Sequence, residues 1–126
     1  MRLLLIGLGG FVGSILRYLI SRFAQGIAPS NGFPWGTLVV NLVGCLLTGV
    51  FIELIADRRI FGPEAYPLLV IGLLGGFTTF SAFSNETVIA FRNGLTAIAV
   101  INILASVLFG LFAVCMGRAI VNLVWK

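Results

Sequence analysis

Four long apolar stretches, with more than half of the charged residues outside them, dominate this chain. Only 10% of the 126 residues are charged and 60% are hydrophobic, whereas about a quarter of a typical soluble domain is charged. A helix that spans a bilayer needs about 20 mostly apolar residues, and such lengths occur at 3–22, 36–56, 66–91 and 95–125. We therefore predict an all-α integral protein of the cell membrane, a single domain over 1–126 with four transmembrane helices.

The same composition excludes several classes of protein. No segment of domain size remains outside the spans, so a globular enzyme is excluded. The chain has no histidine, and Cys45 and Cys115 lie in separate spans, which supports neither a disulfide framework nor a zinc site. The net charge of +4 arises from basic residues scattered at helix ends. That distribution is typical of anchors at a lipid interface, and it predicts no nucleic-acid partner.

A polar segment, GGFTTFSAFSNE at 75–86, interrupts the third stretch. Polar groups in hydrocarbon are costly and usually mark a permeation or binding path. Glycine and threonine are poor helix formers, so Gly75-Gly76 followed by Thr78-Thr79 predicts a break in the third helix. Carbonyl groups freed at such a break can bind a hard cation such as Na⁺. A glycine kink that serves packing alone is the alternative.

Three phenylalanines follow one another at every third position of this segment. Phe77, Phe80 and Phe83 are thereby predicted to share one helical face, with Ser81 and Ser84 on a neighbouring polar stripe. Such a face can be a packing surface. However, aromatic edges are partly positive, so rings beside hydroxyl donors favour a small anion, whereas a cation path is expected to need carboxylates or rings of carbonyls.

Polar residues in the other spans fit a path lined by hydrogen-bond donors. Asn41 lies in the second span, and Asn102 and Ser106 lie four residues apart in the fourth. Arg17 adds a permanent positive charge to the first span, unless its long side chain snorkels to the interface.

We expect different surroundings for the two acidic residues that fall within the predicted spans. Glu53 falls at the end of the second span and is expected to be an ordinary interfacial charge. Glu86 lies one helical turn past Phe83, deeper than a boundary residue, and is a candidate partner for a basic group.

Basic residues and small residues bear on orientation and assembly. The predicted spans put five basic residues on the side of the termini and two on the other, which favours cytoplasmic termini; these are Arg2, Arg58, Arg59, Arg118 and Lys126 against Arg22 and Arg92. Pairs of small residues four apart allow close helix approach, either within one bundle or between subunits. The pairs are Gly9/Gly13, Gly72/Gly76 and Ser106/Gly110.

Taken together, these motifs resemble the CrcB-type fluoride channels, also called Fluc. The likeness runs through GGFVGSILRY on the first span, WGTLVVNLVG on the second and GLLGGFTTFSAFSNE on the third. It implies a fluoride-selective passive channel that exports cytoplasmic fluoride and confers fluoride resistance. It also implies an antiparallel, dual-topology homodimer with two pores and a central Na⁺.

The resemblance further implies roles for single residues. The backbone carbonyls of Gly75 and Thr78 from both subunits would hold the Na⁺, and Phe80 of one subunit would face Phe83 of the other across each pore. The remaining implied residues line the fluoride path (Asn41, Ser81, Ser84, Ser106) or support it (Arg17, Glu86).

Some features depart from this pattern. Ala82 and Gly110 stand where some relatives carry hydroxyls, so Asn102 is a candidate substitute. The excess of basic residues on one side fits dual topology poorly, which makes an oppositely inserted homologue the alternative partner.

Two other functions compete with the channel. A small multidrug-resistance-type proton-coupled exporter is the runner-up, but such a protein is expected to carry a carboxylate in its first span, where this chain has Arg17. A structural subunit of a larger complex would explain the length of the chain and not its cluster of hydroxyls.

Overall fold

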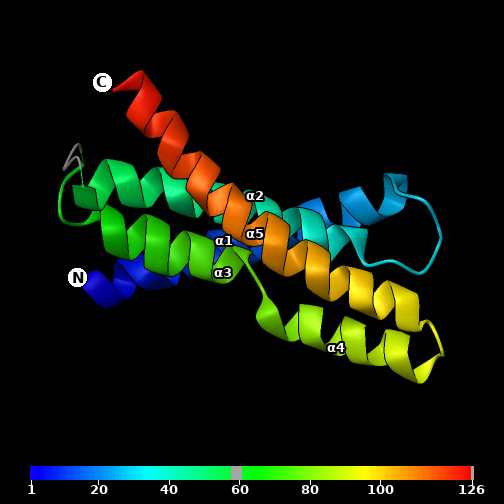
Figure 1. The fold of residues 1–126 in the computed structure, drawn as a ribbon. Helices are drawn as coiled ribbons and strands as arrows, with labels where there is room; N and C mark the ends of the chain where they lie inside the picture. The colour runs from blue at the N-terminus through cyan, green and yellow to red at the C-terminus, as the bar shows by residue number, and fades with distance from the viewer. Residues whose placement is uncertain (58–60, 126) are drawn as a thin grey trace.

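The computed structural model describes residues 1–57 and 61–125 and is helical throughout its regular elements. Arg58, Arg59 and Lys126, which entered the charge count, lie outside the described residues. The elements in chain order are α1 (Arg2–Ile27), α2 (Trp35–Ile52), the π-helical η1 (Glu53–Asp57) and η2 (Tyr66–Leu74), α3 (Gly75–Phe77), α4 (Phe80–Arg92) and α5 (Thr96–Val124) (Figure 1).

Four helical stretches are long and apolar enough to cross a membrane, as predicted, and the chain is a multi-pass membrane protein. They are Arg2–Ile27, Trp35–Ile55, Tyr66–Arg92 and Thr96–Val124. The first runs five residues beyond the predicted end at 22, because Arg22 does not stop the helix. It ends where Ala28 turns extended before Pro29, as a residue preceding proline favours.

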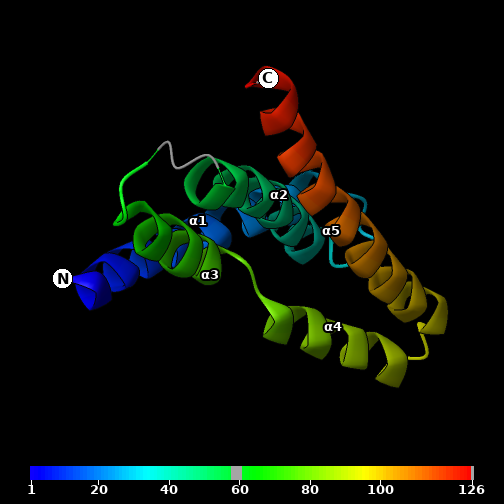
Figure 2. The ribbon, with the colours of Figure 1, turned by 60° about the vertical axis from the view of Figure 1, so that its left-hand side comes forward.

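The third span is broken where the glycines and threonines predicted it. After α3, Thr78 and Thr79 adopt extended backbone conformations, with ψ of 158° and 118°, and α4 begins at Phe80. Figure 2 shows the consequence: α4 is a separate rod, joined to α3 by an extended connection. The π-helical turns of η2 before the break were not predicted.

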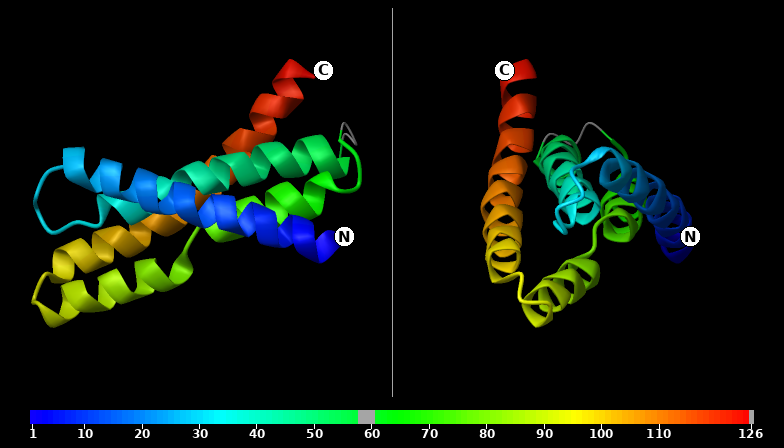
Figure 3. Two further views of the ribbon diagram at one scale, coloured as in Figure 1. Left: turned by 180° about the vertical axis from the view of Figure 1, so that it is seen from behind. Right: turned by 90° about the vertical axis from the view of Figure 1, so that its right-hand side faces the viewer.

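Both termini lie at one end of the bundle. Figure 3 shows the α1–α2 loop and the α4–α5 turn at the opposite end. Helix α2 is central, since it packs against α5 on one side and against α1 and η2 on the other. Among the described basic residues, Arg2 and Arg118 therefore fall on the side of the termini and Arg22 and Arg92 on the other, as the predicted spans required.

Glycines bring α1 and the first half of the third span into backbone contact. A Cβ at Gly13 would overlap the carbonyl oxygen of Leu73, and one at Gly76 would lie 2.6 Å from the carbonyl oxygen of Gly10. The pairs Gly9/Gly13 and Gly72/Gly76 thus serve packing within one chain, the first of the two predicted uses. This close packing of α1 against η2 and α3 keeps the break in the third span next to α1.

Candidate functional site

Asn41 holds the broken backbone of the third span. The Thr79 N–H donates to Asn41 Oδ1 at 2.8 Å, and Asn41 Nδ2 donates to the Thr79 carbonyl at 3.0 Å. In a continuous helix the Thr79 N–H would donate to the carbonyl of Gly75. Because Asn41 takes that N–H, the Gly75 carbonyl is released from the helical ladder.

Thr79 also caps the start of α4. Its Oγ1 accepts from the Ala82 N–H at 3.2 Å, which is the donor that a continuous helix would direct to the Thr78 carbonyl. The Thr78 carbonyl instead accepts from Arg17 Nη1 at 3.4 Å. Two released carbonyls, those of Gly75 and Thr78, therefore lie at the break, and Arg17 contributes to holding it.

A cavity of about 330 Å³ beside the break brings together four residues predicted to line a path. Asn41, Phe80, Phe83 and Ser106 come from α2, α4 and α5, and the other lining residues are Cys45, Thr48, Thr78, Thr79, Val107 and Val114. The rings of Phe80 and Phe83 are tilted at 45° with centroids 5.5 Å apart. We refer to this space as the phenylalanine cavity.

A second cavity, of about 550 Å³, lies between α1, α2 and α4. It contains three of the predicted residues, Arg17, Ser81 and Glu86, and its other lining residues are Ser14, Tyr18, Ser21, Arg22, Thr37, Val40, Thr79, Ala82 and Asn85. Thr79 lines both cavities, so they adjoin at the break. We refer to this second space as the arginine cavity.

The predicted aromatic face is wrong at Phe77. Phe77 is only 4% exposed and belongs to α3, so it does not share a face with Phe80 and Phe83. The stripe of Ser81 and Ser84 along the path stays a prediction. Ser81 faces the arginine cavity, whereas Ser84 is absent from the residues described for either cavity and donates to the Phe80 carbonyl at 2.9 Å.

Helical spacing failed for Phe77 because the three-residue rule holds only while the helix is continuous. Thr78 and Thr79 are extended and restart the helix in a new direction.

Glu86 is held by a hydroxyl and not by a basic group. Thr37 Oγ1 donates to Glu86 Oε1 at 2.7 Å, and Oε2 is buried without a hydrogen bond in the described part of the chain. Arg22, a candidate partner in the same cavity, donates instead to the Tyr18 hydroxyl at 2.8 Å. Sequence reasoning missed Thr37, for which a threonine four residues before Asn41 on the same helix was the only signal.

Asn102 does not substitute for a lining hydroxyl. It is 2% exposed, donates to Thr87 Oγ1 at 2.9 Å and lies outside the residues described for the two cavities. The departures at Ala82 and Gly110 are thus not compensated by an exposed amide at this position.

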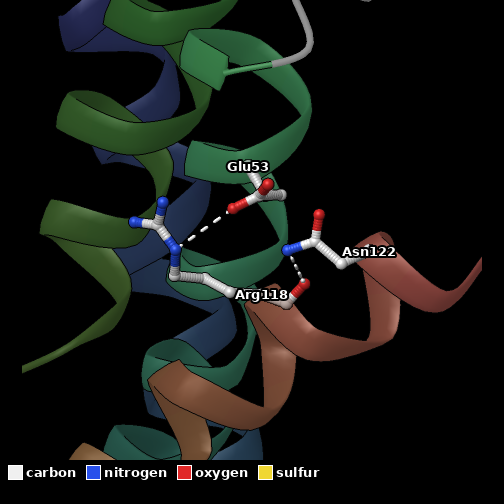
Figure 4. Close-up of polar contacts among 3 residues, drawn as sticks. All are labelled: Glu53, Arg118 and Asn122. Carbon is white, nitrogen blue, oxygen red and sulfur yellow. Dashed lines mark hydrogen bonds and ion pairs between the residues drawn. The ribbon is translucent and has the colours of Figure 1, made fainter. Parts of the chain in front are cut away.

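Glu53 was expected at the interface, but it is buried and ion-paired. It is 6% exposed, and its Oε2 lies 3.1 Å from Arg118 Nε (Figure 4). Asn122 Nδ2 donates to the Arg118 carbonyl at 3.1 Å on the next turn. The pair ties η1 to α5 near the end that holds the termini, because a carboxylate taken out of water requires a charged or hydrogen-bonding partner.

The chain matches known proteins over nearly its whole length. Residues 4–118 match the family described as CrcB-like protein, Camphor Resistance (CrcB). The chain is similar to a Fluoride-specific ion channel FluC from Rhizobium etli, at 47% identity over 94% of each chain. It is also similar to a FluC from Phocaeicola vulgatus, at 47% identity over 91% of this chain and 93% of the relative.

A third relative comes from another organism. The Fluoride-specific ion channel FluC 1 from Methanosarcina acetivorans is 44% identical over 92% of this chain and 87% of its own length. Because the family match covers residues 4–118, which include the broken third span, the chain belongs to the CrcB family.

Proposed function

We propose that this chain forms a fluoride-specific passive ion channel that exports cytoplasmic fluoride. The relatives that share more than two fifths of its residues are named fluoride-specific ion channels. The observation that carries the proposal is the phenylalanine cavity, where two rings meet amide and hydroxyl groups. None of the described residues that line it has a carboxylate, so the cavity does not repel an anion.

The chemistry of this cavity suits a small anion. Carrying an ion across a hydrocarbon core about 30 Å thick requires groups that replace its hydration shell. Asn41 Nδ2 uses one of its two N–H groups on Thr79 and keeps one for an ion, and Ser106 supplies a hydroxyl. Several weak sites in sequence permit release as well as entry. The arginine cavity, with Arg17 and Arg22, supplies positive charge next to this path.

Membership in a family with ion-channel relatives supports the channel and not the multidrug-resistance-type exporter. The first helix carries Arg17 at the depth where that exporter is expected to carry an acid. The same relatives place the chain among transport proteins rather than enzymes.

Fluoride efflux from liposomes tests the proposal. Reconstituted protein should release fluoride rapidly without a proton gradient and release little chloride. We expect Phe80→Ile and Phe83→Ile to impair fluoride efflux severely, because an aliphatic side chain has no positive edge. Phe91→Ile, on the same helix but outside the described lining of both cavities, is the matched control. Unchanged fluoride efflux in both cavity variants would refute the aromatic path.

The proposal includes an antiparallel homodimer. Phe80 is 78% exposed in the single chain although it lines the cavity, so a second subunit is needed to enclose the path. Cysteines placed singly on exposed positions of α4, in a background without Cys45 and Cys115, should cross-link in an antiparallel pattern. A parallel pattern would contradict the arrangement, and cross-links only to a co-expressed homologue would indicate the oppositely inserted partner.

A Na⁺ ion at the centre of the dimer is the last part of the proposal. The released carbonyls of Gly75 and Thr78 are hard oxygen donors, and Gly75 is exposed on the single chain. Each subunit offers two, so the corresponding pair from a second subunit would complete a site for a hard cation. The ion would supply a fixed positive charge in low dielectric. Na⁺ should raise the melting temperature of the purified dimer more than K⁺ does, and an equal effect of both ions would contradict the site.

A further inference from the structure

A buried chain of hydrogen bonds joins α4 to α5 behind the phenylalanine cavity. Asn102 Nδ2 donates to Thr87 Oγ1 at 2.9 Å, and the Thr87 hydroxyl donates to the Phe83 carbonyl at 2.7 Å. Asn102 is 2% exposed and Thr87 7% exposed. Because both residues are already covered by their own chain, a second subunit would not change these contacts. An amide on α5 is thereby linked to the α4 backbone at a residue of the path.

The same amide also contacts a second residue that lines the cavity. Ser106 lies one turn further along α5 and donates its hydroxyl to Asn102 Oδ1 at 3.5 Å. Ser106 and Phe83 line the phenylalanine cavity, whereas neither Asn102 nor Thr87 is among its described lining residues. The hydrogen-bond chain therefore connects two lining residues from outside the space they enclose.

We propose that Asn102 is a positioning residue that sets the spacing of Ser106 and Phe83 across the ion path. The inference rests on the proposed channel function. The amide nitrogen of Asn102 fixes the backbone of Phe83 through Thr87, by two short hydrogen bonds. The amide oxygen of Asn102 holds the Ser106 hydroxyl by a contact at the long limit for a hydrogen bond. That weak contact orients the hydroxyl at rest and lets it turn its proton toward an arriving anion at little cost.

The experiment combines flux with selectivity in reconstituted channels. Asn102→Leu removes both contacts at similar volume, and Thr87→Val removes the shared hydroxyl without changing shape. Each should lower fluoride efflux about tenfold, as expected for the loss of one buried hydrogen bond, and should lower the ratio of fluoride to chloride efflux. Thr87→Ser keeps the hydroxyl and should restore both values. Ala99→Gly removes a buried methyl from the same helix and should leave the selectivity ratio unchanged.

A second test asks whether Ser106 acts through Asn102. Ser106→Ala should reduce efflux in the parent channel and reduce it by a smaller factor in the Asn102→Leu channel, where the hydroxyl has lost its orienting partner. Independent, multiplicative losses would overturn the inference, as would a folded Asn102→Leu channel with the parent's rate and selectivity. If Asn102→Leu does not fold, the isosteric Thr87→Val channel decides by the same criteria. A parent chain that releases no fluoride refutes the proposed function itself, whereas a conducting parent with unaffected variants refutes only this inference.

Discussion

Replacing Asn41 by alanine should destabilise the break in the third span. Both polar groups of the Asn41 amide bond to Thr79, at 2.8 Å to its N–H and at 3.0 Å to its carbonyl. The Thr79 N–H has no helical partner at this point, since Thr78 and Thr79 are extended, whereas the Thr79 carbonyl, at the N-cap of α4, also accepts the first hydrogen bond of that helix. Asn41→Ala thus leaves one donor, the Thr79 N–H, unpaired within a membrane span.

The size of the effect follows from this unpaired donor. A polar group left unpaired away from water costs about 1–3 kcal/mol. Asn41 lines a cavity of about 330 Å³, which can admit water to part of the exposed backbone. We therefore expect the lower part of this range, about 1–2 kcal/mol of unfolding free energy.

Thr48→Val is the matched control for this measurement. Thr48 lies on the same helix and the same cavity, but its hydroxyl donates to the Gly44 carbonyl of its own helix at 2.7 Å. Its loss should cost well under the value expected for Asn41→Ala. Unfolding in mixed detergent micelles gives the free energies, and hydrogen exchange of the peptide containing Thr79 reports the break directly. Equal destabilisation by the two variants, with unchanged exchange at Thr79, would refute the reasoning.

Two further predictions concern packing and charge. Gly13→Ala should lower the melting temperature sharply or prevent folding, because its Cβ would overlap the Leu73 carbonyl. A Cβ at Gly7 would meet open space, so Gly7→Ala should be neutral or stabilise the protein by up to about 1 kcal/mol. Similar melting temperatures for the two variants would contradict the close contact at Gly13. For the ion pair in Figure 4, in which Glu53 is buried and Arg118 is half-exposed, a double-mutant cycle with Glu53→Gln and Arg118→Gln should give a coupling of about 1 kcal/mol. Additive losses would show that the contact contributes nothing.

The spans and the break could be predicted because they depend on local properties. Hydrophobic length determines which stretches cross the bilayer, and the predicted third span, 66–91, differs from the observed Tyr66–Arg92 by one residue. The weak helix propensity of the segment from Gly75 to Thr79 acts within a few residues, so the position of the break could also be predicted from the sequence. The loop after α1 and the turn at Gly94, which has a φ of 76°, follow from similarly local signals.

The site was only partly predictable. Asn41, Phe80, Phe83 and Ser106 do meet at one cavity, as the motifs and the resemblance implied. However, Ser81 lies in a different cavity, because Ser81 and Phe83, two residues apart on the continuous helix α4, project to nearly opposite sides of that helix. No periodicity within α2 reveals that Asn41 bonds the backbone of Thr79, since the two residues are 38 positions apart.

The partners of buried polar and charged groups could not be predicted from the sequence either. Glu53 stands at the end of an apolar stretch, where sequence predicts an interfacial residue, and its burial depends on Arg118 from the far end of the chain. The burial of Asn102 likewise depends on Thr87 in another helix. Each polar group was visible in the sequence, but its partner was not.

The amino-acid sequence alone predicts that this chain spans a membrane, how many times it does so, where its third helix breaks and which polar groups must be accommodated in hydrocarbon. These properties follow from transfer free energy and backbone propensity, which act residue by residue. The packing of the helices establishes which polar group satisfies which, and so which residues line each cavity. Hydrogen bonds between helices depend on how the helices cross. The glycine contacts of α1 and the hydrogen bonds from Asn41 to Thr79 set that arrangement.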